Sequence, residues 1–141
     1  LGSRSLARGI EGLRAGSRAI QGLDTLSNGR VVRKVLSPLS GVQKTALRTE
    51  ARAVYDVANP GLRERLGLQI HHRVPLESAH LLPDANPNRL ANLIGLPAHI
   101  DEQINAQWNA FRLGLGGRVP SAKEVLQYTQ EIENQYSQYY H

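Results

Sequence analysis

The clearest periodic pattern of apolar and polar positions runs from Gln43 to Val57. Apolar residues recur there at intervals of three and four, which places Leu47, Ala51, Val54 and Tyr55 on one helical face. A second row, with i+4 spacing, is basic and consists of Lys44, Arg48 and Arg52. We therefore predict an amphipathic helix over residues 43–57, ended by Asn59-Pro60-Gly61, and a short further turn of helix from Leu62 to Leu66.

The pattern changes to alternation between Leu68 and Val74. This short run stops at Pro75, and alternation over a few residues followed by proline is typical of a strand. Residues 83–89 are dense in Asp, Asn and Pro, and they predict a loop. The segment from Leu90 to Leu96 is short and mostly apolar, so it suits either a second strand or an irregular turn.

Two further helices are predicted in the last third of the chain. Pro97 suits the first position of a helix that ends at Gly114, with an apolar stripe of Ile100, Ile104, Trp108 and Phe111. A last helix begins at Ser121, with Glu124 placed for a capping box. Its inward residues are predicted to be Val125, Tyr128, Ile132, Tyr136 and Tyr139. The whole pattern predicts a mostly helical α+β fold, with a small strand–loop–helix unit packed among helices.

Residues 1–42 differ from the rest in composition and charge. They mix Gly, Ser and Arg around short apolar groups, and we interpret them as a basic leader or linker before a helical domain over residues 43–141. Residues 1–57 hold ten Lys/Arg against four Asp/Glu, whereas residues 58–141 hold seven against eight. A basic arm beside a near-neutral body suits contact with nucleic-acid phosphates, and it equally suits a solvated linker.

The chain contains neither cysteine nor methionine. Without thiols it can form no disulfide and no thiolate zinc site. No apolar run approaches the length of a membrane span, and the N-terminus lacks the apolar core of a signal peptide, so we expect no membrane segment. Because the chain starts at Leu1 and has no methionine, we expect it to be a piece of a longer polypeptide.

Candidate chemistry is concentrated at the end of the predicted strand, where His71 and His72 are adjacent. Successive side chains of a strand point to opposite faces, so the two imidazoles should lie on different sides. Hydrolysis of a phosphodiester near neutral pH needs an activated water and stabilisation of negative charge. One imidazole can accept the proton of water while its neighbour helps to hold a divalent metal ion. The alternative is an ordinary pair with one histidine in the core and one at the surface.

The motif His71-His72-x-x-Pro75, followed by Asn92-Leu93 and a helix bearing His99, resembles the HNH nucleases. These enzymes, also called His-Me finger or ββα-metal nucleases, include bacteriocin DNases and the C-terminal toxin domains of Rhs-type and other polymorphic toxins. The resemblance covers about residues 66–112 and implies that the strand–loop–helix unit is a ββα-metal catalytic unit.

The resemblance also implies a role for each motif residue. His72 would be the general base, His71 a metal ligand, and Asn92 the residue that orients the base. The helix would supply further ligands, for which we favour His99. Because Gln103 stands where a second histidine is usual, Asp101 and Asn105 are the alternative pair, and their oxygen atoms would suit Mg²⁺ or Mn²⁺. The cofactor is expected to be a divalent metal ion: Mg, Mn, Zn or Ni.

The function implied is that of a metal-dependent endonuclease, with DNA favoured over RNA as the substrate. Arg73 and Arg89, together with Arg112 and the basic leader, are the expected phosphate contacts. By the same resemblance the chain would be an antibacterial effector, delivered to act in the cytoplasm of a target cell and blocked in its producer by a cognate immunity protein. The alternative function is a non-catalytic basic module that binds nucleic acid and holds a structural metal, and a third is a metal-free scaffold.

Overall fold

The computed structural model describes residues 35–141, and predictions about residues 1–34, which make up most of the basic leader, lie outside them. The described chain is a mostly helical α+β fold, as predicted. Its main elements are α2 (Gly41–Ala58), α3 (Leu62–Leu66), β1 (Leu68–His72), β2 (Leu93–Pro97), α4 (Ala98–Gly114) and α5 (Ala122–Tyr136). Short 3-10 turns cover Leu76–Leu81, Leu90–Asn92 and Ser137–Tyr139. No described helix is long and apolar enough to cross a membrane.

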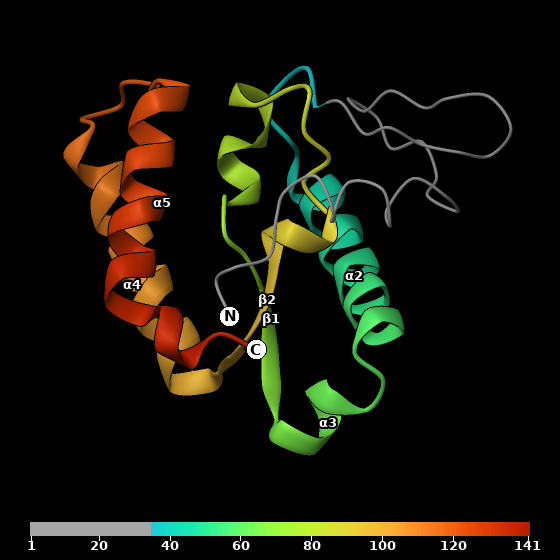
Figure 1. Ribbon diagram of the computed structural model, residues 1–141. Helices are drawn as coiled ribbons and strands as arrows, with labels where there is room; N and C mark the ends of the chain where they lie inside the picture. Colours follow the sequence, from blue (N-terminus) through green and yellow to red (C-terminus); the bar gives the residue numbers. More distant parts are fainter. Residues whose placement is uncertain (1–34) are drawn as a thin grey trace, which may run out of the picture.

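The two strands form an antiparallel pair at the centre of the fold, between α2 and the α4–α5 pair (Figure 1). The sequence left two alternatives for residues 90–96, a second strand or an irregular turn. The structure has both, since the segment divides into a 3-10 turn and β2. In the pairing register His72 lies opposite Leu93 and His71 opposite Ile94. Leu93 packs with α2, whereas Ile94 packs with α4, so each face of the sheet has its own helix.

Helix α2 covers the face of the sheet that carries Leu93. Ser40 caps the helix, and its hydroxyl oxygen accepts a hydrogen bond from the backbone N–H of Gln43. In return, the side-chain oxygen of Gln43 accepts a hydrogen bond from the backbone N–H of Ser40. The predicted inward residues Leu47, Ala51 and Tyr55 are fully buried. The backbone of β2 lies very close to its neighbours here, since a Cβ on Gly95 would lie 2.7 Å from the Leu68 side chain and 2.8 Å from the Tyr55 hydroxyl. Glycine at 95 therefore lets α2 sit directly on β2.

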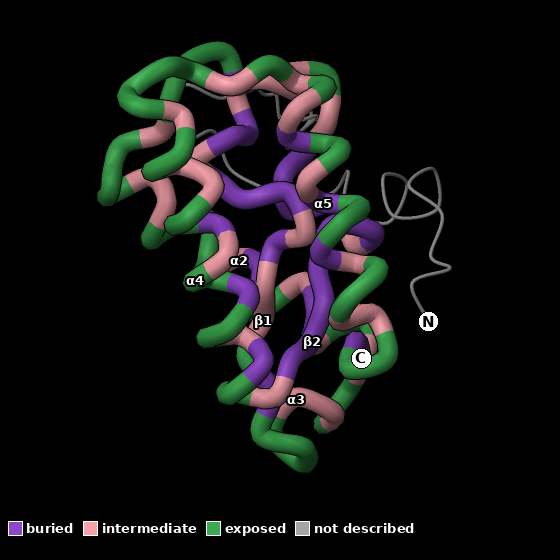
Figure 2. The backbone as a smooth tube through the Cα atoms, turned by 90° about the vertical axis from the view of Figure 1, so that its left-hand side faces the viewer, coloured by how far each residue is buried: buried purple, intermediate pink, exposed green. Residues whose placement is uncertain are grey.

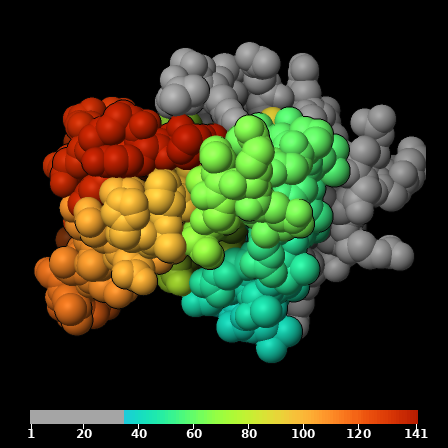
Figure 3. Space-filling model, turned by 90° about the horizontal axis from the view of Figure 1, so that it is seen from below, coloured from blue at the N-terminus to red at the C-terminus, as the bar shows by residue number. Residues whose placement is uncertain are grey.

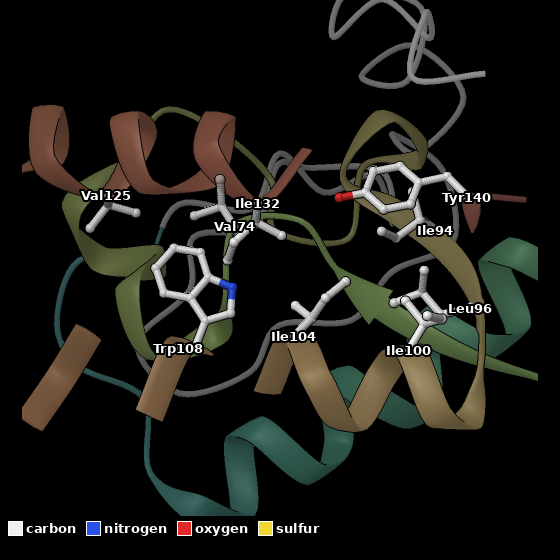
Figure 4. Close-up of a cluster of buried hydrophobic side chains, with 9 residues drawn as sticks. All are labelled: Val74, Ile94, Leu96, Ile100, Ile104, Trp108, Val125, Ile132 and Tyr140. Atoms are coloured by element: carbon white, nitrogen blue, oxygen red, sulfur yellow. The ribbon is translucent and has the colours of Figure 1, made fainter. Parts of the chain in front are cut away.

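The larger apolar core lies between α4, α5 and the other face of the sheet (Figure 4). The predicted stripe of α4 is confirmed, because Ile100, Ile104 and Trp108 are buried and Phe111 packs against them. Pro97 differs slightly from its prediction, since it is the last residue of β2 and the N-cap of α4, whose first residue is Ala98. Figure 2 shows that burial is concentrated along β2 and on the helix faces turned toward the sheet, whereas β1 is buried only at its two ends.

The C-terminal segment corrects one prediction. The capping box of Ser121 and Glu124 is present, and Val125 and Ile132 are buried as expected. Tyr139, however, is 38 % exposed, and Tyr140 is the residue that enters the core. The reason is that α5 ends at Tyr136 and the following 3-10 turn shifts the helical register. The backbone of His141 then exchanges two hydrogen bonds with Gly95 of β2.

Candidate functional site

A cleft of about 460 Å³ opens beside β1, between α2 and α4. We use "the cleft" for the space lined by Arg48, Arg52, Gln69, Ile70, His71, His72, Pro75, Leu76, Glu77, Asp101, Asn105, Trp108, Asn109 and Arg112. Seen from the end where α3 lies, α4 and the C-terminal segment that includes α5 form one half of this face of the molecule and the α2–α3 segment the other (Figure 3). The cleft is therefore polar and carries arginines on both walls.

The two adjacent histidines point to opposite sides of β1, as the alternation of a strand requires. The imidazole of His71 reaches Asp101 at the start of α4, with Nδ1 3.1 Å from Oδ1. The imidazole of His72 instead reaches Asn88 in the loop that packs under α2, with Nε2 2.6 Å from Oδ1. Both residues nevertheless line the cleft, because the cleft spans the edge of β1 from one helix to the other.

The side chain of His72 is buried. The residue is 7 % exposed and hydrogen-bonded to Asn88, which is itself fully buried. Burial lowers the pKa of His72 to about 4, because a charged imidazolium would lose its hydration there. The ring is consequently neutral at pH 7, which is the form that can accept a proton.

His71 belongs to a chain of three polar side chains on the α4 side of the cleft. Asp101 lies against Nδ1 of His71, and its second oxygen accepts a hydrogen bond of 3.3 Å from Asn105, one helical turn further along α4. The other ring nitrogen of His71, Nε2, is buried and has no hydrogen-bond partner. A buried polar atom without a partner is costly, and it marks a position where a cation or an ordered water would be stabilised.

These residues offer a donor set that fits a divalent cation. His71 contributes an imidazole, Asp101 a carboxylate and Asn105 an amide, and all three line the cleft. No group of three His, Asp or Glu side chains is gathered anywhere in residues 35–141, so the amide is needed to complete the set. Imidazole with carboxylate and amide oxygens suits Mg²⁺ or Mn²⁺ as well as Zn²⁺.

His99, the helix ligand favoured from the sequence, is not part of this group. It lies in the first turn of α4, its side chain is exposed, and it does not line the cleft. Asp101 is two residues further along the helix, a rotation of about 200°, and therefore faces the opposite way. The structure thus brings together His71 with the alternative pair, Asp101 and Asn105.

Asn92 also has a different position from the one expected. Its side chain accepts a hydrogen bond from the backbone of Val74 and donates to the carbonyl oxygens of Val74 and Pro87. It therefore fastens the two ends of the loop between the strands and makes no hydrogen bond to His72. The contact with the imidazole belongs to Asn88, which the sequence placed only in a loop rich in Asn and Pro, a composition that predicts turns rather than a partner for a base.

The two arginines expected to contact phosphate are used within the fold. Arg73 pairs with Glu133 of α5 and donates to the carbonyl oxygen of Ala91. Arg89 is 5 % exposed and donates to the carbonyl oxygen of Asn86. Neither lines the cleft. Arg89 is buried and Arg73 is half-buried, and these contacts make both side chains anchors of the loop between the strands.

The basic side chains of the cleft are Arg48 and Arg52 from α2 and Arg112 from α4. Glu77 partly balances them, because its carboxylate lies 3.4 Å from Lys44 and 3.8 Å from Arg48. Burial alone would raise the pKa of Glu77, but a backbone hydrogen bond and the charge of Lys44 outweigh burial and hold that pKa below its usual value. The helical row of Arg48 and Arg52 was visible in the sequence, but its proximity to the histidines was not.

His80 lies in the 3-10 turn Leu76–Leu81. Its Nδ1 is buried without a hydrogen-bond partner, and the residue does not line the cleft. His80 therefore lies in the same region as the His71–His72 pair but outside the cleft.

No protein family, curated protein or solved structure matches this chain. The resemblance to HNH nucleases therefore rests on the motif residues of 66–112 alone. What the cleft does has to be inferred from the side chains that line it.

Proposed function

We propose that the chain is a metal-dependent endonuclease of the HNH type that hydrolyses phosphodiester bonds, with DNA as its principal substrate. One observation carries the proposal: two adjacent histidines face opposite sides of β1 and still line one cleft. The imidazole of His72 is buried and neutral at pH 7, and the imidazole of His71 contacts the carboxylate of Asp101. Such a division supplies a base and a cation site within the reach of one phosphate.

His72 would act as the general base. Its ring is neutral at pH 7, so it can accept a proton from a water molecule as the water oxygen attacks phosphorus. The proton moves from the water to the imidazole and the water oxygen forms the new P–O bond. The P–O bond to the leaving nucleotide oxygen breaks, and its electron pair departs on that oxygen, which takes a proton from solvent. The low pKa keeps the base unprotonated, and it also makes the imidazole a weaker base than a solvated one. Proximity and exclusion of water therefore have to supply part of the rate.

His71 and Asp101 would hold the metal ion, with Asn105 beside them. A bound divalent cation would supply positive charge to the phosphoryl and leaving oxygens. Nδ1 of His71 and Oδ1 of Asp101 already lie 3.1 Å apart, so a cation held by both would replace their hydrogen bond, and Asn105 fixes the second carboxylate oxygen of Asp101.

Arg48, Arg52 and Arg112 would bind the phosphates on either side of the bond that is cut. They lie on the two walls of the cleft, and guanidinium groups bind phosphate oxygens through paired hydrogen bonds. This assignment replaces Arg73 and Arg89, whose side chains are engaged in the fold. Contacts of this kind position the backbone without reading its sequence.

The biological role we propose is that of an antibacterial toxin domain, delivered by a longer polypeptide to the cytoplasm of a target cell. Its producer would then need an immunity protein, and the arginines of the cleft favour an acidic one. Such a partner should protect cells that express the chain. Its association rate should fall steeply as salt is raised, because opposite charges speed the encounter.

The experiment that tests the proposal is incubation of the purified chain with supercoiled plasmid and with total RNA. Each substrate is tested with Mg²⁺, Mn²⁺, Zn²⁺ or Ni²⁺ and with EDTA. We expect metal-dependent nicking of the plasmid that EDTA abolishes, and retention of this activity in the His99→Ala variant. Absence of cleavage of both substrates under every metal, with the folded chain still binding DNA, would favour the non-catalytic binding module instead.

A further inference from the structure

We infer that Asn88 is a positioning residue that fixes the tautomer of His72, so that Nε2 carries the hydrogen and Nδ1 keeps its lone pair for the cleft. This inference rests on the proposed function, since it concerns the same base. Asn88 lies outside the motif and connects His72 to α2 through hydrogen bonds.

The orientation of the Asn88 amide is fixed by its two acceptors. Its Nδ2 donates to the carbonyl oxygen of Leu47, at 3.0 Å, and to Oε1 of Glu50, at 2.9 Å, both on α2. A rotated amide would place Oδ1 against these two oxygen atoms and lose both hydrogen bonds. The backbone is held as well, because the N–H of Asn88 donates to Oδ1 of Asn86 at 2.9 Å. With the nitrogen turned to α2, the oxygen has to face His72.

The orientation of the amide determines the tautomer of the imidazole. Oδ1 of Asn88 lies 2.6 Å from Nε2 of His72 and can only accept, so Nε2 must donate. A neutral imidazole has one N–H, and Nδ1 is then the nitrogen with a free lone pair. Nδ1 takes part in no hydrogen bond among the described residues, and His72 lines the cleft. Nδ1 is therefore the ring nitrogen that is available to accept a proton from a water molecule.

The opposite tautomer would remove the base. Nδ1–H would then point where a proton has to be accepted, and the lone pair of Nε2 would oppose the oxygen of Asn88. Glu50 adds to the preference, since its carboxylate is the stronger of the two acceptors that hold the amide. In this arrangement α2 does more than cover the sheet: through Leu47, Glu50 and Asn88 it determines which ring nitrogen of His72 faces the substrate.

The first test needs no substitution. Nitrogen-15 NMR of the imidazoles in the metal-free chain distinguishes the two tautomers, because a protonated and an unprotonated ring nitrogen differ widely in chemical shift. We expect His72 to carry its hydrogen on Nε2 in essentially all molecules. A His72 ring protonated mainly on Nδ1 would overturn the inference whether or not the chain cuts DNA.

The second test separates positioning from packing with two variants of similar size. Asn88→Gln keeps an amide that can accept from Nε2–H and donate to α2, whereas Asn88→Leu removes both functions. We expect Asn88→Leu to give a mixture of tautomers and to lower cleavage of plasmid about 10- to 100-fold, and Asn88→Gln to keep the single tautomer and more of the activity. Asn134→Leu, at an exposed position of α5, is the matched control and should change neither.

The outcomes also separate this inference from the proposed function. A chain that cuts DNA while Asn88→Leu keeps both full activity and a single tautomer overturns the positioning role alone. A folded chain that cuts nothing under any metal overturns the proposed function, and the role of Asn88 in catalysis with it. If Asn88→Leu does not fold, the tautomer of the unmodified chain and of Asn88→Gln decides.

Discussion

The two sides of β1 differ in what they do to a histidine. On the α4 side, His71 meets a carboxylate, and its other ring nitrogen is left without a partner. On the α2 side, His72 meets a neutral amide in a dry environment. One residue of strand alternation is enough to place adjacent, chemically identical side chains in different environments. The helix packed on each face of the strand determines that environment.

The sharpest way to break this comparison is to replace His72. His72→Gln keeps an N–H donor near the position of Nε2 for Asn88 but cannot accept a proton. We expect it to lower the rate of plasmid cleavage by about 10²–10⁴, because general-base catalysis is typically worth that much. Steady-state cleavage rates measured beside circular dichroism check the prediction. A folded His72→Gln chain with the wild-type rate would remove His72 from the mechanism.

The burial of His72 should also be visible in the pH dependence of stability. Its pKa falls from 6.5 to about 4 on folding, so the unfolded chain binds more protons between these values. The contribution to stability is complete above pH 6.5 and is lost as the pH falls toward 4, by about 3 kcal/mol in total. The charged or titratable neighbours of the ring are His71, Arg48 and Glu77.

Urea denaturation of the metal-free chain at pH 7.0, 5.5 and 4.5 measures this effect. Other groups titrate in the same range, so the quantity of interest is the difference between the wild type and His72→Gln. We expect the wild type to lose more stability than the variant as the pH falls. Parallel pH profiles would mean that His72 is hydrated in solution and titrates normally.

The α4 side can be tested through metal affinity. Asp101→Ala should weaken binding of Mn²⁺ by about 10- to 100-fold, because it removes a carboxylate that either binds the ion or orients the His71 ring. His99→Ala should leave the affinity unchanged, since His99 is exposed and outside the cleft. Isothermal titration of both variants decides between the two helix positions. The reverse result would restore His99 as the ligand.

The smallest expected effect concerns the arginines. Arg112→Gln should weaken DNA binding a few-fold and reduce the slope of log affinity against log salt by about one, as loss of one phosphate contact does. Arg89→Gln should leave that slope unchanged and lower the stability of the fold, because Arg89 is buried and anchors the loop. Fluorescence anisotropy over a range of salt concentrations measures the slopes. Equal slopes for Arg112→Gln and wild type would exclude Arg112 from the phosphate contacts.

Much of the fold could be predicted because its signals are local. The stripes of α2 and α4, the alternation of β1 and the capping box of Ser121 each depend on residues a few positions apart. Tyr139 was misplaced because a single 3-10 turn rotates the chain after α5, and periodicity does not show where a helix ends by a fraction of a turn.

The site was predictable only in part. The opposite orientation of His71 and His72 follows from the strand alone, and the structure has it. The partners of the two rings do not follow from the strand, since Asp101 is 30 residues and Asn88 16 residues away in the sequence. The choice between His99 and Asp101 depends on how α4 is rotated about its axis, which the sheet determines. Arg73 and Arg89 looked free because Glu133 and the backbone of Asn86 are brought to them only by folding.

In the proposed mechanism, the two sides of β1 divide one reaction between them. The rate of plasmid cleavage measured against metal concentration for the wild type, His72→Gln and Asp101→Ala tests this division. We predict that His72→Gln lowers the maximal rate and leaves the half-saturating metal concentration unchanged, whereas Asp101→Ala raises that concentration. A His72→Gln chain that regains the wild-type maximal rate at high metal concentration would contradict the division.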